Sequence, residues 1–226
     1  MPRRARITLA NEPHHIIQRG NNRSACFYTD DDYWQYLDWL REYSVEHGCD
    51  IHAYVLMTNH VHLLITPESS EDLATMMKCL GQRYVQYINR TYGRSGTLWE
   101  GRFKSCITQE HKYVLGCYRY IELNPVRANM VEHPGEYLWS SYRANAQQEA
   151  CDLVSPHGTY LGLGPHDDDR QKQYREIFKS ELDPALVDQI RVATNSNYAL
   201  GSEKFPQIQT ALGRRSSRGK PRRPRS

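Results

Sequence analysis

The stretch CDIHAYVLMTNHVHLLITP, residues 49–67, predicts two β-strands joined by a tight turn. Apolar residues alternate before Thr58 and Asn59, and a second apolar run follows, which is the pattern of an antiparallel hairpin. His60 and His62 stand two residues apart in the second strand, so their side chains share one face. The other face carries the residues that we expect to enter the core: Val61, Leu63 and Ile65.

Helical and extended patterns on both sides of this hairpin predict the rest of the fold. In chain order they are a short strand that runs into a polar turn in 14–23, a helix in 29–48, the hairpin, a helix in 69–93, a loop followed by a strand in 96–108, and a helix in 109–125. Gly48 ends the first helix, and Pro125 ends the last one, because the residue before a proline disfavours helical geometry. Without the last helix the order is β–α–β–β–α–β, which is typical of a ferredoxin-like fold. We therefore expect an α+β domain whose antiparallel sheet has helices on one face.

The C-terminal part of the chain differs in composition from this domain. We expect the domain to cover residues 1–147, a Gly- and Pro-rich connector to cover 148–170, and a helical extension to cover 171–213. The extension contains a helix, the stretch NSNYALGS and an amphipathic helix, which fits either a helix-turn-helix or a small bundle packed on the domain. In either form we expect it to add contacts to DNA.

The last residues, 214–226, are strongly basic. They contain seven Arg and Lys residues and no acid, and without them the formal net charge changes from +3 to −4. Because this tail has no apolar residue to bury, we expect it to be disordered. It fits either polyanion binding through counterion release or a solubilising role.

Composition also limits the class of protein. The chain has 226 residues, of which 39% are apolar, enough for a core. No apolar run approaches the roughly 18 residues of a membrane span, and the basic N-terminus lacks the apolar segment of a signal peptide. Six Cys without a C-x-x-C pair argue against a zinc ribbon and a disulfide scaffold. We expect reduced thiols in a cytoplasmic protein that does not bind membranes.

The two histidines of the hairpin can chelate one divalent ion, although exposed structural histidines would give the same pattern. The helix in 109–125 supplies a context, because Tyr120 and Asn124 are four residues apart and lie on one helix face. Asn124 offers a carbonyl oxygen as a third ligand, and Tyr120 offers a phenol as a nucleophile toward phosphorus. Two imidazoles and an amide are neutral, so such an ion would act as a strong Lewis acid on a phosphate oxygen.

Three separated motifs, NHVHLLI, GTLWEGRFKS and YRYIELNPVRA, resemble those of the single-tyrosine HUH transposases, an IS200-like family. The resemblance is closest to the branch associated with repetitive extragenic palindromes (REP) in bacterial chromosomes. It spans roughly residues 10–145. It implies a ferredoxin-like endonuclease and strand transferase that uses Mg²⁺ or Mn²⁺ on hairpin-forming single-stranded DNA, as a monomer or a homodimer, near the nucleoid.

Carried over by position, the resemblance assigns His60 and His62 as metal ligands and Tyr120 as the nucleophile that keeps the 5′ phosphate. Asn124 takes the metal-side position four residues further on, where related insertion-sequence enzymes often have Gln. That departure leaves the third ligand open.

Further residues fit DNA handling on their chemistry. The turn after the first strand is polar and basic, with Arg19, Asn21, Asn22 and Arg23. Arg102 and Lys104 alternate along EGRFKS, residues 100–105, so we expect them to share a face, and Arg119 and Arg127 flank the Tyr120 turn. Aromatic candidates for base stacking are Trp99 and Phe103, and candidate proton carriers are His14, His15 and His111.

Two other functions remain open from the sequence. One is a domesticated DNA-binding protein that keeps the fold and mobilises nothing, although the joint presence of His60, His62, Tyr120 and Asn124 favours retained chemistry. The other is an unrelated metal hydrolase. It would need a carboxylate. The only one within the two motifs that carry the histidines and the tyrosine, NHVHLLI and YRYIELNPVRA, is Glu122, which is expected to point away from the Tyr120–Asn124 face.

Overall fold

The structure, a computed structural model, describes residues 7–108 and 111–200. Its centre is a four-stranded antiparallel sheet with the strand order β2-β3-β1-β4. The strands are β1 (His14–Arg19), β2 (Cys49–Met57), β3 (His60–Pro67) and β4 (Lys104–Ile107). This is the antiparallel sheet that the sequence predicts, with the hairpin turn at Thr58 and Asn59.

Strand β1 lies in the middle of the sheet, and its register positions the histidines. Ile17 pairs with His62, and Arg19 pairs with His60. Paired residues of neighbouring strands project from the same face. One face of the sheet therefore carries both histidines together with Ile17 and Arg19.

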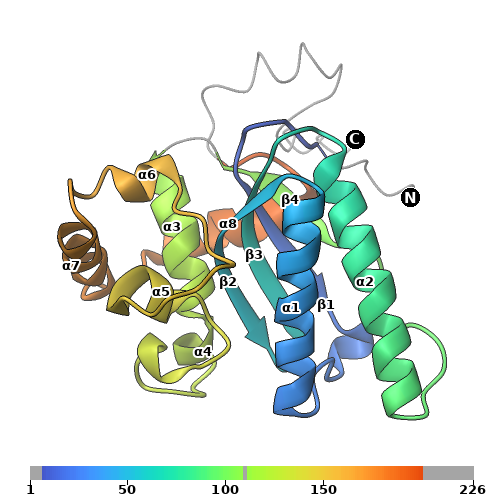
Figure 1. Ribbon diagram of the computed structural model, residues 1–226. Helices are drawn as coiled ribbons and strands as arrows, with labels where there is room; N and C mark the ends of the chain where they lie inside the picture. The colour runs from blue at the N-terminus through green and yellow to red at the C-terminus, as the bar shows by residue number, and fades with distance from the viewer. Residues whose placement is uncertain (1–6, 109–110, 201–226) are drawn as a thin grey trace, which may run out of the picture.

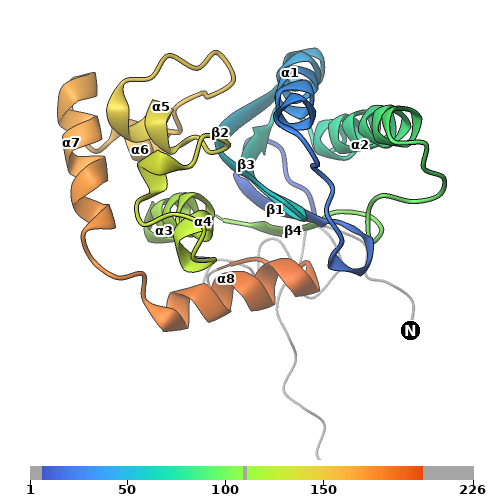
Figure 2. The same ribbon diagram turned by 90° about the horizontal axis from the view of Figure 1, so that it is seen from below.

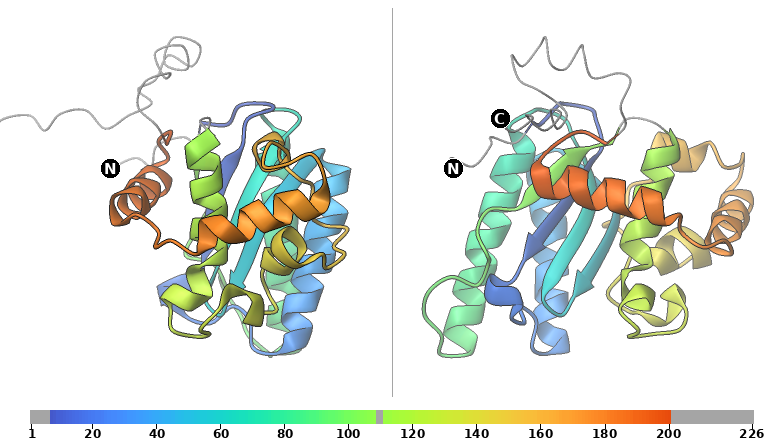
Figure 3. Two further views of the ribbon diagram at one scale, coloured as in Figure 1. Left: turned by 90° about the vertical axis from the view of Figure 1, so that its left-hand side faces the viewer. Right: turned by 180° about the vertical axis from the view of Figure 1, so that it is seen from behind.

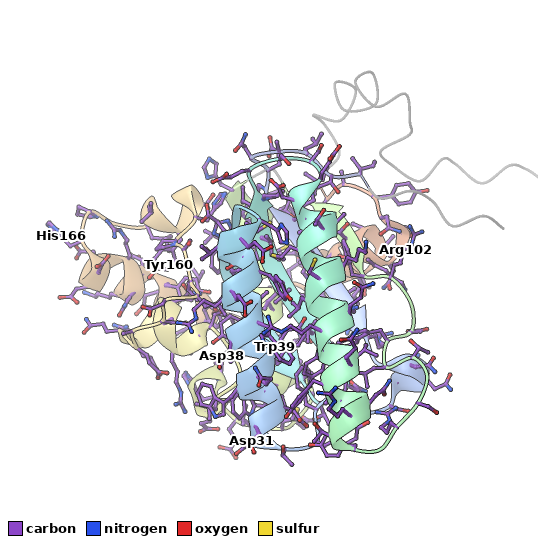
Figure 4. The ribbon with its side chains drawn as sticks, turned by 45° about the vertical axis from the view of Figure 1, so that its right-hand side comes forward. Asp31, Asp38, Trp39, Arg102, Tyr160 and His166 are labelled. Carbon is purple, nitrogen blue, oxygen red and sulfur yellow. The ribbon has the colours of Figure 1, made fainter. Side chains whose placement is uncertain are left out.

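Helices α1 (Asp30–Glu46) and α2 (Asp72–Thr91) cover the opposite face of the sheet (Figure 1). Thr29 caps α1 through a capping box with Asp32, which satisfies backbone donors that the first turn leaves unpaired. Trp39 lies between the two helices in Figure 4, and the Arg83 guanidinium of α2 sits 4.7 Å from the centre of its ring. This aromatic contact fastens the two helices side by side.

The histidine face is covered as well. Helix α3 (His111–Glu122) contacts β2 and β3, and α8 (Pro184–Ser196) contacts β4 and β1. Figure 2 shows these two helices on the side of the sheet opposite to α1 and α2, and Figure 3 shows α8 lying across the strands from behind. The expected arrangement of helices on one face therefore holds for α1 and α2 but is incomplete. Strand β3 is buried on both faces, since Leu64 and His62 on one face are 0% and 2% exposed and Val61 on the other is 0% exposed, so both faces require a cover.

Short elements connect the rest of the chain. They are the 3₁₀ turns η1 (Asn21–Arg23) and η2 (Pro134–Glu136) and the helices α4 (Asn124–Arg127), α5 (Tyr142–Gln147), α6 (Gly158–Leu161) and α7 (Asp167–Phe178). Helix α3 ends at Glu122, and Pro125 lies in the first turn of α4, where its missing N–H costs nothing. The basic tail 214–226 and the second helix of the expected helix-turn-helix pattern lie outside the described residues.

The six cysteines, all within the described residues, are free thiols. Within 7–108 and 111–200, no helix has the length and apolar character needed to cross a membrane.

Candidate active site

The catalytic and metal-ligand candidates meet in one pocket of about 310 Å³ on the histidine face of the sheet. His60 and His62 reach it from β3, and Tyr120 and Asn124 reach it from the junction of α3 and α4. Other lining residues include Arg19 of β1, Arg127 of α4, and Arg191, Thr194 and Asn195 of α8. The helices that cover the histidine face of the sheet, α3, α4 and α8, thus form walls of the pocket.

Tyr120 and Asn124 hold each other in place across one helical turn. Asn124 Nδ2 donates to the Tyr120 carbonyl oxygen at 2.7 Å and to that of Ile121 at 3.3 Å. Because the amide nitrogen is used in this way, Oδ1 is the Asn124 atom that remains for a metal ion. Tyr120 itself is 6% exposed, and its ring meets the His62 ring edge-on with centroids 5.5 Å apart.

A chain of hydrogen bonds fixes which nitrogen of His62 carries the proton. Thr194 Oγ1 donates to the Ile190 carbonyl oxygen at 2.7 Å, so it accepts from His15 Nδ1 at 2.9 Å. His15 Nε2 is then unprotonated and accepts from His62 Nδ1 at 2.9 Å. His62 Nε2 therefore keeps its lone pair, the form in which an imidazole binds a metal.

His60 reaches the same state through its neighbour in the turn. Its Nδ1 lies 2.6 Å from Asn59 Oδ1, which only accepts hydrogen bonds, so Nδ1 carries the proton and Nε2 is free. The His60 and His62 rings lie 5.1 Å apart between centroids. Two imidazole lone pairs and one amide oxygen thus fit a divalent ion.

Only two residues of this candidate set, His60 and His62, belong to the types that commonly bind metal ions in proteins. Across the described parts of the chain, no cluster of three or more His, Cys, Asp or Glu side chains has an arrangement that would hold a metal ion. A site here depends on Asn124 and on ligands from substrate or water, which leaves coordination positions open to substrate.

Burial keeps the imidazoles of the pocket neutral. It lowers the pKa of His60 to about 4, with Arg19 adding to the effect, and lowers the pKa of His15 to about 3. Burial also holds the pKa of His62 well below its ordinary value, and the neighbouring His15 and His60 lower it further. At neutral pH these side chains are metal-competent bases rather than cations.

Two basic residues of the pocket lie close to Tyr120 and its partners. The Arg127 guanidinium sits 4.8 Å from the centre of the Tyr120 ring. Arg19, opposite His60 in the sheet, lines the same pocket. The pocket thus combines a phenol, neutral imidazoles and guanidinium groups, the set needed to bind and attack a phosphodiester.

Arg102 and Lys104 lie on different faces of the sheet, so the expectation that they share one is wrong. Lys104 Nζ donates to Asn195 Oδ1 of α8 at 3.0 Å, whereas Arg102 lines a pocket under α2. The alternation fails because Arg102 precedes β4, next to Gly101, which has a φ of 132° that breaks the extended backbone.

The other candidates for DNA contact lie away from the pocket. Asn22 is exposed on η1. The Arg119 guanidinium points toward the α7–α8 connection, where it donates to the Ser180 carbonyl oxygen at 2.5 Å. Neither residue lines the pocket of Tyr120.

Of the three candidate proton carriers, His15 lies at the pocket of Tyr120, whereas His14 and His111 lie away from it. His15 contacts both His62 and Tyr120. His14 points to the opposite face and bonds the Glu12 carbonyl oxygen, and His111 bonds Thr159. Sequence reasoning gave no reason to include Thr194, which lies 179 residues from His15 in the chain.

Comparisons with known proteins place the chain in a family and show its fold. Residues 9–124 match the family model described as "Transposase IS200 like". The REP-associated tyrosine transposase, solved bound to a REP hairpin, shares the fold with a TM-score of 0.56 at 18% identity, covering 70% of this chain and 93% of its own. A presumed transposase from Deinococcus radiodurans R1 gives a TM-score of 0.38 at 19% identity, covering 50% and 91%. Among curated proteins, none matches significantly.

The four-stranded antiparallel sheet and its helices have the fold of the REP-associated tyrosine transposase. The family match extends over more than half of the chain. The chain therefore belongs to the IS200-like transposase family.

Proposed function

We propose that this protein cuts and rejoins single-stranded DNA at hairpin-forming sequences, with Tyr120 as the nucleophile. The observation that supports this most strongly is that Tyr120, His60, His62 and Asn124 line one pocket. The two histidines come from β3, and Tyr120 and Asn124 come from α3 and α4, with α2 and β4 between them in the sequence. A fold that only bound DNA would have no need to gather them.

His60, His62 and Asn124 would hold a divalent ion, Mg²⁺ or Mn²⁺. When bound, the ion supplies Lewis-acid activation of the scissile phosphate. Arg127 and Arg19 contribute positive charge that orients the phosphate next to the phenol.

The chemical step is a transesterification. The Tyr120 oxygen bonds to phosphorus and loses its proton, while the bond from phosphorus to the 3′ oxygen breaks. The products are a 5′ phosphate on Tyr120 and a free 3′ hydroxyl. Attack of a 3′ hydroxyl on the phosphotyrosine rejoins the strand, so the cycle needs no nucleotide cofactor.

Hairpin DNA is the proposed substrate, because the structural relative was solved with a REP hairpin. All four site residues come from one chain, which supports a site that is complete in a monomer. Acting on chromosomal palindromes, the protein would work in the bacterial cytoplasm with the nucleoid.

The test is cleavage of hairpin DNA from the flanks of the protein's own gene, labelled at either end, with Mn²⁺ or with chelator. We expect metal-dependent cutting that leaves an extendable 3′ hydroxyl and a 5′ end that kinase cannot label. Tyr120→Phe should abolish cutting, and the matched control Tyr113→Phe should retain it. Tight hairpin binding without any cutting would contradict the proposal and favour a domesticated DNA-binding protein.

A further inference from the structure

A second and larger pocket, of about 790 Å³, lies under α2 on the opposite side of the sheet from Tyr120. Its walls are α2, the end of β1 and the loop that leads to β4. Figure 4 shows Arg102 of this loop beside α2, on the side of the molecule turned away from His166. It shares no lining residue with the pocket of Tyr120.

Two buried polar groups in the pocket lack partners. Gln18 is 7% exposed and Trp99 is 5% exposed, and both line the pocket. Among the residues that the structure describes, neither Gln18 Oε1 nor Trp99 Nε1 has a hydrogen-bond partner. Unpaired buried polar groups cost stability, so native proteins retain few of them, and each one calls for an explanation.

Gly81 of α2 lies next to the side chains of Gln18 and Trp99. A Cβ at position 81 would lie 3.6 Å from Gln18 Nε2 and 3.8 Å from Trp99 Nε1, which are ordinary contact distances. Alanine would therefore fit, and it favours the helix more than glycine does. By contrast, a Cβ at Gly116 of α3 would meet Leu186 Cδ2 at 2.8 Å, so packing explains that glycine.

Nothing in the packing requires glycine at position 81, and its missing side chain leaves room beside Gln18 and Trp99 that a methyl group would occupy. Trp99 Nε1 is a donor, and the Gln18 amide offers a donor or an acceptor on rotation of its last torsion angle. Phe103 and Val85 supply apolar walls, and the exposed cation Lys78 lies beside them. A flat heterocycle with a hydrogen-bonding edge and a neighbouring phosphate matches this surface.

We propose that this pocket takes one unpaired nucleobase of the DNA that is cut at Tyr120, with its flanking phosphates on Lys78 and Arg102. The proposal rests on the function proposed above. Gln18 and Arg19 are consecutive in β1 and line the two pockets from opposite faces. Trp99 forms a bridge with Gly20 at the same end of β1. A strand can therefore pass around this end of the sheet from one pocket to the other.

The test uses Gly81→Ala, which places a methyl group before Gln18 and Trp99 without strain. The probe is a labelled hairpin with a single-stranded extension on each side, and a series in which one unpaired position at a time is abasic. In the unchanged protein, one abasic position should weaken binding by about fivefold or more. In Gly81→Ala that same position should no longer matter, while the melting temperature is equal or higher. Thr75→Ala, on the exposed side of α2, is the matched control and should behave as the unchanged protein.

The outcomes separate this inference from the proposed function. If the unchanged protein cuts the hairpin, but each abasic position weakens binding to Gly81→Ala as much as it weakens binding to the unchanged protein, the inference is wrong and the function stands. If the unchanged protein neither binds nor cuts the hairpin, both fail. Free deoxynucleoside monophosphates should bind far more weakly than the hairpin, and micromolar binding of one of them, lost in Gly81→Ala, would reassign the pocket to a free nucleotide.

Discussion

The state of His62 depends on side chains from β1 and α8 as well as on its own strand. His15 accepts from His62 Nδ1, and Thr194 accepts from His15 Nδ1 because its own proton goes to the Ile190 carbonyl oxygen. Outer partners of this kind hold a metal-ligating imidazole in one tautomer and orientation. Helix α8 thereby becomes part of the proposed metal site without touching the ion.

Thr194→Val should weaken Mn²⁺ binding by about tenfold, because His15 then loses the acceptor that fixes its tautomer. Calorimetric titration measures the affinity, and ¹⁵N chemical shifts of the metal-free protein report the tautomer of His62. Thr108→Val, which also removes a buried hydroxyl bonded to a cysteine, is the control and should bind Mn²⁺ as before. Unchanged affinity and unchanged His62 shifts in Thr194→Val would contradict the hydrogen-bond chain.

The sequence reveals the local parts of the site and misses the distant ones. His60 and His62 share a strand face, and Tyr120 and Asn124 share a helix face, so short spacings predict both pairs. The contact of Thr194 with His15 depends on how α8 folds back over the sheet. No spacing in the chain encodes that contact.

Among the elements, α3 is the one that carries the proposed nucleophile, and Glu122 fastens it. Glu122 is fully buried and accepts from Ser141 Oγ at 2.6 Å, from Asn145 Nδ2 at 2.8 Å and from the Tyr174 hydroxyl at 2.6 Å. Those three donors belong to α5, its cap and α7. The carboxylate therefore joins α3 to the C-terminal helices, consistent with the expectation that it points away from Tyr120.

Glu122→Ala should lower the free energy of unfolding by about 3 kcal/mol, because it removes the buried acceptor that Ser141, Asn145 and Tyr174 share. Glu122→Gln keeps the shape and one carbonyl acceptor, so its loss should be smaller. Urea denaturation measures both. Glu149→Ala removes an exposed carboxylate in a loose ion pair and should cost less than about 1 kcal/mol. A loss in Glu122→Ala no larger than in Glu149→Ala would show that Glu122 does not fasten α3.

At the scale of elements, the sequence predicts α1, α2, α3 and the strands well because their signals are local. The capping box at Thr29 and the turn at Thr58 and Asn59 each lie within a few residues. The expectation of helices on one face holds for α1 and α2 and is incomplete for a different reason. The order of elements does not show that β3 is buried on both faces, or that α8 supplies the second cover.

The whole molecule carries several buried neutral histidines, and these set its response to acid. Burial lowers the pKa values of His14, His52 and His60 to about 4 each and that of His15 to about 3, from an ordinary 6.5. Between pH 6.5 and 4 the unfolded chain binds more protons than the folded one, so stability falls on acidification. Burial raises the pKa of Glu122 to about 7, so between pH 7 and 4.5 the protonation of this one group increases the stability of the folded protein. The four histidines lower the stability over the same range by more than this single carboxyl raises it.

We therefore expect the free energy of unfolding to fall by at least about 3 kcal/mol between pH 7 and pH 4.5. Urea denaturation at a series of pH values measures it. A stability that is constant or higher at pH 4.5 would mean that the histidines titrate normally in the folded protein.

The most direct measurement is mass spectrometry of the protein after incubation with hairpin DNA and Mn²⁺, followed by nuclease and protease digestion. We expect a single modified peptide, with a nucleotide joined through its 5′ phosphate to Tyr120, and no modified peptide when a chelator replaces Mn²⁺. A nucleotide on Tyr113 or Tyr118 instead, or cleaved DNA without any modified tyrosine, would contradict the assignment of Tyr120 as the nucleophile.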